Sequence, residues 1–346
     1  MTVATGFKIS LARATLGDRP RVYEWMAHSD LTERTMGPPV FSEHPVPTYE
    51  EFCERFLPHY FDGTRPFDGR GFMIRAGGAD IGFLSHGPIS LFKDVTELDL
   101  WLKSRDVAGK GFGSDALQTA CDWLQASFGV NRFLLRPSRR NVHALRAMRR
   151  AGFRETDLDS REVIDQLEVP HGTYGDEVLL FRILDLPRAE LELLPNRTYV
   201  FIDTEFTNLS EPRLISVGAV ATDATAFYCE LMGYPEEHCS DFVRSTVLSL
   251  LDGDAVPHPV AAQSFSQWLA ARSAAVPAVL VSDSGFDRWA MTDLLGREDL
   301  PAGVQWIRVP IAYEQLDEVA RSLGLRRHHA LDDARALRHA VLSRQR

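Results

Sequence analysis

Acidic residues and a histidine recur in the second half of the chain at a spacing that favours metal chemistry. Asp203 and Glu205 stand two apart in Ile-Asp-Thr-Glu-Phe, and Asp287 follows in Gly-Phe-Asp. His328 and Asp333 lie in His-His-Ala-Leu-Asp-Asp-Ala near the end. Hard divalent cations prefer carboxylate oxygens, and two such cations can clamp the attacking and leaving oxygens of a phosphate displacement. These four carboxylates and one imidazole therefore suit hydrolysis of a phosphodiester with two metal ions.

The elements expected around these residues would bring them together. Residues 199–203 form a short, apolar run that is typical of a buried strand, and Asp203 and Glu205 at its end point to one face. Other strands are expected at 214–220, 226–231, 279–282 and 306–309, and helices at about 240–251, 262–274, 287–295, 313–323 and 331–343. Strands followed by helices, a strand and more helices predict a layered, mixed α/β fold.

In this order the motifs resemble those of the DEDDh 3′–5′ exonuclease superfamily, which has a ribonuclease H-like fold, over about residues 197–343. Asp-Thr-Glu-Phe-Thr, with Leu-Ile-Ser-Val-Gly-Ala-Val after it, is most similar to the bacterial exoribonuclease branch. The resemblance implies two Mg²⁺ or Mn²⁺ ions held by Asp203, Glu205, Asp287 and Asp333, with His328 as the general base. It also implies that the substrates are 3′ ends of nucleic acid, RNA in preference to DNA.

The histidine of this set has a neighbour of the same type. The superfamily places the histidine five residues before the last aspartate, which selects His328 with Asp333 rather than His329. Counted back from Asp332, the same spacing falls on Arg327, which cannot act as a base at neutral pH. His328 is therefore the expected base.

The third carboxylate has an alternative in Asp283. We prefer Asp287, because the Phe286-Asp287 pair matches the superfamily better. Several arginines surround the last motif and would either form a solvated helix face or contact phosphate. These arginines are Arg326, Arg327, Arg335 and Arg338.

A glycine-rich turn is the main feature of the first half. It lies between an alternating strand at 95–102 and an amphipathic helix that ends near residue 128. A turn that enters a helix presents unpaired N–H groups and the positive end of the helix dipole, which suit a pyrophosphate. A tight turn without a ligand is the other interpretation. The candidate cofactor-binding residues of the turn are Gly109, Lys110, Gly111, Phe112, Gly113 and Ser114.

The continuation resembles the Gcn5-related N-acetyltransferases (GNAT), over about residues 7–183. A strand at 132–136 follows, and Asn141 then opens a helix that ends at Gly152-Phe153. The resemblance implies a mixed sheet with two splayed parallel strands that hold acetyl-CoA, with Asn141 contacting the cofactor. The stretch from Leu11 to Trp25 is similar to branches that modify aminoglycosides or the N-termini of ribosomal proteins, which implies an amine as acyl acceptor.

The first half also departs from the GNAT pattern. Ala108 stands where the family usually has arginine or glutamine, although its backbone amide would still serve a pyrophosphate. Met148 stands where many members have a tyrosine that acts as the acid. Glu97 and Asp99 share a strand face, and either acts as a base or both form a polar face. We therefore expect acetyl-CoA binding and treat turnover as a separate question.

Length and composition bound these hypotheses. A chain of 346 residues suggests about two domains, and the Pro187–Pro195 segment divides them. We expect a GNAT-like domain at 1–185, a linker at 186–196 and an exonuclease domain at 197–346. The net charge of −10 argues against a broad basic surface for nucleic acid, but bound metals reverse the sign of an acidic site. Four cysteines without a Cys-x-x-Cys pair, and no signal peptide pattern, predict a cytoplasmic protein.

The leading hypothesis is a metal-dependent exonuclease fused to an acetyltransferase domain. One alternative makes acetyl transfer the main activity and the nuclease an accessory. Another makes the first domain a non-catalytic module that senses acetyl-CoA or docks a partner.

Overall fold

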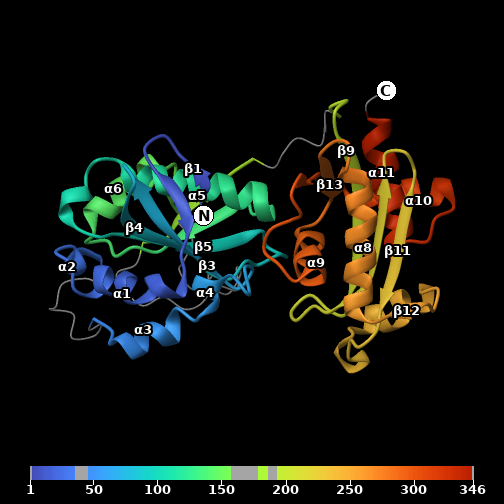
Figure 1. Ribbon diagram of the computed structural model, residues 1–346, viewed down its shortest axis with the longest axis horizontal. Coiled ribbons are helices and arrows are strands. Elements are labelled where there is room, and N and C mark those ends of the chain that lie inside the picture. The colour runs from blue at the N-terminus through green and yellow to red at the C-terminus, as the bar shows by residue number, and fades with distance from the viewer. Residues whose placement is uncertain (1, 36–45, 157–177, 186–192, 345–346) are drawn as a thin grey trace. The chain divides into compact units, whose positions relative to one another are not determined.

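A computed structural model of the chain divides into two compact units (Figure 1). One comprises Met1–Ala126 and Val130–Asp185, and the other comprises Ser127–Gly129 and Leu186–Arg346. Each unit is built on its own sheet, which confirms the expected mixed α/β class. Residues 186–192 of the expected linker lie outside the described residues. The structure describes residues 2–35, 46–156, 178–185 and 193–344.

Eight strands in the described part of the N-terminal unit form one sheet, in the order β1-β2-β3-β4-β5-β6-β8-β7. The strands are β1 Thr2–Thr5, β2 Ser10–Arg13, β3 Arg70–Ala76, β4 Ala79–His86, β5 Val95–Leu102, β6 Arg132–Leu135, β7 Arg154–Glu155 and β8 Leu180–Ile183. The α-helices are α1 Arg19–Ala27, α2 Thr32–Thr35, α3 Tyr49–Arg55, α4 His59–Asp62, α5 Phe112–Phe128 and α6 Val142–Arg150. Short 3₁₀ turns are η1 Leu16–Asp18 and η2 Arg105–Val107.

Alternation along the strands gives this sheet two packed faces. Met73 of β3 joins a core with Phe52 of α3 and Phe61 of α4 on one face. The next residue back, Phe72, points the other way, and its ring packs edge-on against Trp123 of α5, with centroids 5.1 Å apart. Successive side chains of a strand face opposite sides, so α3 and α4 cover one face and α5 the other.

The only parallel pairing among the described strands of this sheet joins β5 and β6. Its register runs from Val95 opposite Arg132 to Glu97 opposite Leu134. Beyond that point β5 continues to Leu102 without pairing to β6, while its other edge pairs with β4 from Leu98 to Leu102. The two parallel strands are thus paired over only three residues of each.

The C-terminal unit has a six-stranded sheet in the order β12-β11-β10-β9-β13-β14. The β9–β10 and β10–β11 pairs are antiparallel, whereas β13 is parallel to both β9 and β14. The strands are β9 Thr198–Phe206, β10 Leu214–Ala221, β11 Ala226–Leu231, β12 Ala255–Val256, β13 Ala278–Ser282 and β14 Val304–Arg308. The α-helices are α8 His258–Ser273, α9 Gly285–Leu295, α10 Tyr313–Leu323 and α11 Ala330–Ser343.

Helices cover both faces of this second sheet. Val200 and Ile202 of β9 pack into a cluster with Phe265 of α8 and Met291 of α9. The intervening Phe201 packs into a second cluster with side chains of α10 and α11. A strand that is buried on both faces has a continuous apolar run, and this is why residues 200–202 carry no polar side chain.

The expected helix over about 240–251 is a helical segment of mixed type. A π-helical turn, η4 Val243–Val247, is followed directly by a 3₁₀ turn, η5 Leu248–Leu250, and a separate 3₁₀ turn, η3 Glu236–His238, precedes them. Val243 and Val247 are buried with Ile215 and Cys239, and Leu248 and Leu251 pack against them. These apolar contacts hold the segment in place, because helical stability in proteins comes mainly from packing an apolar face.

None of the described helices is both long and apolar enough to cross a bilayer.

Candidate functional site

Three segments of the C-terminal unit bring acidic side chains together. Asp203 and Glu205 lie near the end of β9, Asp287 lies in the first turn of α9, and Asp333 lies in the first turn of α11. His328 lies in the loop before α11. The side chains fall into two groups, and within each group the possible ligand atoms all lie within 4.8 Å of one another.

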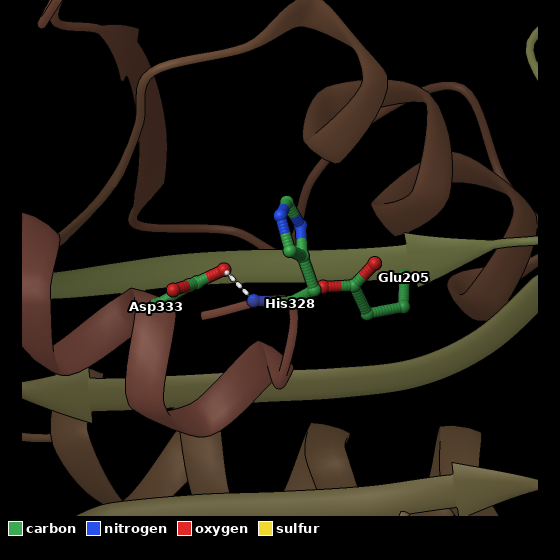
Figure 2. Close-up of side chains that lie close together, drawn as sticks. All are labelled: Glu205, His328 and Asp333. Atoms are coloured by element: carbon green, nitrogen blue, oxygen red, sulfur yellow. Dashed lines mark hydrogen bonds between the residues drawn. The ribbon is translucent and has the colours of Figure 1, made fainter. Parts of the chain in front are cut away.

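The first group consists of Glu205, His328 and Asp333. Figure 2 shows Glu205 and Asp333 on either side of His328, whose imidazole ring extends away from the bond between its backbone and Asp333. That bond runs from the main-chain N–H of His328 to Asp333 Oδ2, at 2.9 Å. Arg327 Nη1 lies 2.5 Å from the other oxygen of Asp333. Main chain and arginine together fix the orientation of this carboxylate.

The second group consists of Asp203, Asp283 and Asp287. Asp287 is only 2% exposed. The Thr204 hydroxyl donates to its Oδ1 at 2.8 Å, whereas its Oδ2 is buried without a hydrogen-bond partner among the described residues. Asp287, which we preferred as the third carboxylate, and Asp283, its alternative, are therefore both present at the site.

Crowding of like charges dominates the electrostatics here. Burial, followed by the charges of Asp333 and Asp287, raises the pKa of Asp203 well above its usual range. Burial and then Asp333 raise the pKa of Glu205 to about 8. Burial, with the charge of Asp283, likewise raises the pKa of Asp287 well above its usual range. Ionised carboxylates in such a cluster need compensating positive charge.

Divalent cations fit this centre. The donor set is almost entirely carboxylate oxygen, which hard cations prefer over nitrogen or sulfur. Asp287 belongs to the cluster, and its Oδ2 is a buried acceptor without a partner among the described residues; a buried acceptor without a donor costs about 1–3 kcal/mol. A cation would both satisfy that oxygen and neutralise the neighbouring charges.

A glycine lets α11 approach the strand that carries the acids. Gly218 of β10 lies opposite Asp203 of β9 in the sheet register. A Cβ atom at Gly218 would lie 2.2 Å from the backbone carbon of Ala330 and 2.2 Å from the nitrogen of Leu331. The first turn of α11 therefore packs directly on the backbone of β10. This contact places Asp333 beside the end of β9.

His328 has a left-handed backbone with φ of 65°. Its ring is surrounded by two exposed aromatic residues. Tyr313 Oη lies 3.1 Å from His328 Nε2, and the Phe242 ring meets the imidazole edge-on at 4.9 Å. Burial lowers the pKa of His328, which keeps the imidazole neutral near pH 7 and able to accept a proton.

The neighbouring His329 and Asp332 contact other parts of the fold and not the acidic cluster. His329 is 1% exposed and stacks on Tyr228, with centroids 4.5 Å apart. Asp332 accepts from Arg326 and from Arg335, each at 2.8 Å, and these arginines lower its pKa against the effect of burial. The pair that superfamily spacing selects is therefore the pair that faces the acidic cluster.

The four arginines around the last motif all contact the protein itself. Arg326 pairs with Asp252 and Asp332. Arg327 pairs with Asp317 and Asp333. Arg335 pairs with Asp332, and Arg338 donates to the carbonyls of residues 221 and 222. These contacts within the protein explain the positions of the four arginines without a bound phosphate.

In the N-terminal unit, the glycine turn leads into α5 with two left-handed residues. Gly109 has φ of 75° and Gly111 has φ of 86°, a conformation that glycine adopts at no steric cost. Helix α5 begins at Phe112, so Phe112, Gly113 and Ser114 supply the unpaired N–H groups of its first turn. Lys110 accepts a hydrogen bond at its carbonyl from Lys8 Nζ, at 2.9 Å. The turn thus presents its amides at a helix N-terminus.

The amide of Ala108 is not offered in the same way. We expected it to remain available for a pyrophosphate, but it donates to the carbonyl of Arg105 at 3.0 Å and closes η2. A 3₁₀ turn needs this bond because it is closed by i to i+3 hydrogen bonds.

Other candidate residues of this unit have partners within the fold. Asn141 caps α6, since its side chain accepts from the Ala144 N–H at 3.1 Å. Glu97 forms a two-pronged ion pair with Arg136, at 2.8 and 2.5 Å, where β5 and β6 separate. Met148 is buried in α6. Asp99 is exposed on β5, so of the two candidate bases it is the one that solvent reaches.

Sequence reasoning did not find several residues that contact the site. Thr204 stands between Asp203 and Glu205, and a hydroxyl there gave no signal of its contact with Asp287. Tyr313 opens α10 far from any motif. Asp283 did have a signal, because it directly follows β13 and precedes Asp287 by four residues, but we weighed it only as a substitute.

Comparison with known proteins distinguishes the two units. The acetyltransferase (GNAT) domain family matches residues 8–154, and no family matches the C-terminal half. None of the curated proteins matches the chain.

Several solved acetyltransferases resemble about half of the chain. An aminoglycoside acetyltransferase with coenzyme A is 18% identical, covering 51% of this chain and 94% of its own, with a TM-score of 0.39. A ribosomal L7/L12 α-N-protein acetyltransferase with coenzyme A is 18% identical, covering 54% and 99%, with a TM-score of 0.41. A spermidine N-acetyltransferase from Vibrio cholerae with coenzyme A and spermine is 16% identical, covering 51% and 95%, with a TM-score of 0.38. At these values we draw no argument about this chain from them.

The family match covers the glycine turn, α5, the parallel pair β5–β6 and α6, which are the elements that the sequence singled out. Residues 8–154 of this chain are an acetyltransferase (GNAT) domain.

Proposed function

We propose that the C-terminal unit, residues 197–346, is a two-metal 3′–5′ exonuclease with a ribonuclease H-like fold, and that RNA is its preferred substrate. The observation that carries this proposal is a pair of acidic groups, one with Glu205, His328 and Asp333 and the other with Asp203 and Asp287, in which Asp203 interacts electrostatically with the carboxylates of both. The preference for RNA rests on the similarity of the Asp-Thr-Glu-Phe-Thr motif to the bacterial exoribonuclease branch.

Bound Mg²⁺ or Mn²⁺ ions would supply a nucleophilic water and neutralise charge on the phosphate. Asp203 and Asp287 would hold one ion, and Glu205 and Asp333 the other, with Asp203 close enough to both groups to contribute to each. His328 would accept the proton of the attacking water at a ring nitrogen. Tyr313 Oη lies 3.1 Å from His328 Nε2, and this contact holds the imidazole in a fixed orientation beside the acids.

A direct experiment uses the full chain with 3′- and 5′-labelled RNA and DNA oligonucleotides. We expect stepwise loss of nucleotides from the 3′ end with Mg²⁺ or Mn²⁺, faster on RNA, and none with EDTA. Products that shorten from the 5′ end, or cleavage that persists in EDTA, would contradict the proposal.

We propose acetyl-CoA binding for the N-terminal unit, residues 1–185, with an amine as acyl acceptor. The family match to residues 8–154 and the two left-handed glycines before α5 support it. Gly109 to Ser114 would receive the pyrophosphate, and Asp99 would accept the proton of the amine. Because Met148 supplies no acid for the leaving thiolate and Asn141 is committed to its cap, a module that binds acetyl-CoA without transfer is the alternative for this unit.

Calorimetry with acetyl-CoA, followed by an assay of free thiol release in the presence of spermidine or an aminoglycoside, separates these alternatives. Heat of binding with thiol release supports an enzyme, and heat of binding without release supports a binding module.

A further inference from the structure

The second acidic group holds one carboxylate more than the superfamily pattern requires. Asp203 and Asp287 belong to that pattern, whereas Asp283 stands outside it. The possible ligand atoms of all three nonetheless lie within 4.8 Å of one another. Three carboxylates at this spacing match the oxygen ligands of a single hard cation.

A second observation points to a cation at the same place. Asp287 is 2% exposed, and its Oδ2 has no hydrogen-bond partner in the described part of the chain. Thr204 satisfies only the other oxygen. A buried carboxylate oxygen without a donor is costly, so this oxygen calls for a positive partner that the protein does not supply.

The backbone on either side of Asp283 is held firmly. Arg308 Nε donates to the carbonyl of Asp283 at 3.0 Å. The Ser282 carbonyl accepts from the Val309 N–H at 2.8 Å, and the Ser282 hydroxyl donates to the Ser284 carbonyl at 2.9 Å. These bonds fix the segment between β13 and α9, so the position of the Asp283 side chain follows from the fold.

Arg308 and Arg327 both interact electrostatically with Asp283. Arg308 Nε donates to its main-chain carbonyl, and Arg327 is paired with Asp317 and Asp333. The Asp283 side chain is only partly exposed. Its possible ligand atom lies within 4.8 Å of those of Asp203 and Asp287.

We propose that Asp283 is a third carboxylate ligand of the ion held by Asp203 and Asp287. This inference rests on the proposed metal centre. Each ion then has three carboxylates, one set from Asp203, Asp283 and Asp287 and the other from Glu205, Asp333 and the shared Asp203. Affinity for hard cations rises with the number of charged ligands, so Asp283 raises the affinity for the ion beside Asp287.

The test measures Mn²⁺ binding to the full chain by calorimetry, without nucleic acid. We expect two ions in the native protein. Asp283→Asn keeps the size of the side chain and removes one charge. It should weaken the binding of one ion by roughly tenfold or more and leave the binding of the other unchanged. Asp293→Asn, at an exposed position of helix α9, is the matched control and should bind both ions normally.

Thermal unfolding supplies a second readout. Without metal, Asp283→Asn should raise the melting temperature because it relieves repulsion, and the further rise on adding Mn²⁺ should be smaller than in the native chain. Unchanged affinity for both ions in Asp283→Asn would overturn this inference and leave the proposed centre intact. A native chain that binds no Mn²⁺ at millimolar concentration would overturn the centre itself.

Discussion

In the N-terminal unit the framework matches a known family, whereas several side chains expected to contact the cofactor or move a proton have other roles in the fold. Asn141 caps a helix, Glu97 is paired with Arg136, and Met148 stands in place of an acid. In the C-terminal unit no family matches the framework. There two acidic groups, which contain Asp203, Glu205, Asp287, His328 and Asp333, come from three separate segments, and Asp203 interacts electrostatically with carboxylates of both groups.

The difference shows that similarity of framework and completeness of chemistry are separate properties. A family match registers the order and packing of elements over some hundred residues. Catalysis depends on a few side chains whose neighbours are free to vary. The two units therefore make different experimental demands, since one needs a test of turnover and the other a test of the reaction class.

The largest effect should come from Asp203→Asn. Asp203 is the carboxylate whose pKa responds to all the others, and a bridging carboxylate has no substitute in a two-metal site. We expect loss of oligonucleotide hydrolysis and unchanged heat of acetyl-CoA binding. Asp223→Asn, on the exposed turn after β10, is the control. Hydrolysis that survives Asp203→Asn would remove the contrast between the two units.

Substitutions at the two histidines should rank in a definite order. His328→Ala should lower the rate by roughly 10²–10⁴-fold, the usual contribution of a general base, whereas His329→Ala should mainly lower stability, because His329 is buried against Tyr228. His328→Gly should lose the same activity yet melt higher than His328→Ala, since its backbone is left-handed. Rates and melting temperatures measured side by side decide this, and the reverse ranking would select the other histidine.

Gly111→Val should weaken the binding of acetyl-CoA by at least roughly tenfold. A Cβ atom there would lie 3.2 Å from Lys8 Nζ, and φ of 86° is strained for valine. Gly78→Val carries a similar φ of 80° in an open turn, so it reproduces the backbone cost away from the cofactor turn. Calorimetry on both variants separates the two effects. Equal affinities would mean that the turn does not receive the cofactor.

The smallest effect concerns stability and pH. In the folded protein the pKa of Glu205 is raised to about 8 from an ordinary value near 4.5. Glu205 therefore loses its proton at a lower pH in the unfolded chain than in the folded one. In EDTA, Glu205 should therefore stabilise the C-terminal unit most below about pH 4.5, and this contribution should be lost as the pH rises to about 8. A drop of a few degrees in melting temperature is expected, and Mn²⁺ should cancel it. A pH-independent difference between EDTA and Mn²⁺ would contradict this account.

Local pattern predicted much of the framework. Alternation predicted β5 over 95–102, and apolar periodicity predicted α10 over 313–323, with the bounds that the structure has. These elements depend on residues near in sequence. The stretch over 243–250 was predicted as helical, but its division into a π turn and a 3₁₀ turn was not, because that form depends on the contact of Val243 and Val247 with Ile215.

The site shows the same limit. The spacing of Asp203 and Glu205 already placed them on one strand face, but the contact of Thr204 with Asp287 and that of Tyr313 with His328 join residues distant in sequence. The Ala108 amide was expected to be available, but it donates to the carbonyl of Arg105 in the turn η2, which the sequence did not predict. Contacts of this kind follow from packing, which a single sequence does not display.

Gly218 gives this centre a marker that is independent of its acids. The atoms that a side chain would strike belong to the backbone of Ala330 and Leu331, so no change of rotamer or neighbouring side chain can make room. Any other chain that forms the same centre by the same approach of helix to strand must keep a glycine at this position. Acidic residues occur by chance in many sequences, whereas their coincidence with this glycine distinguishes a true relative from an accidental match.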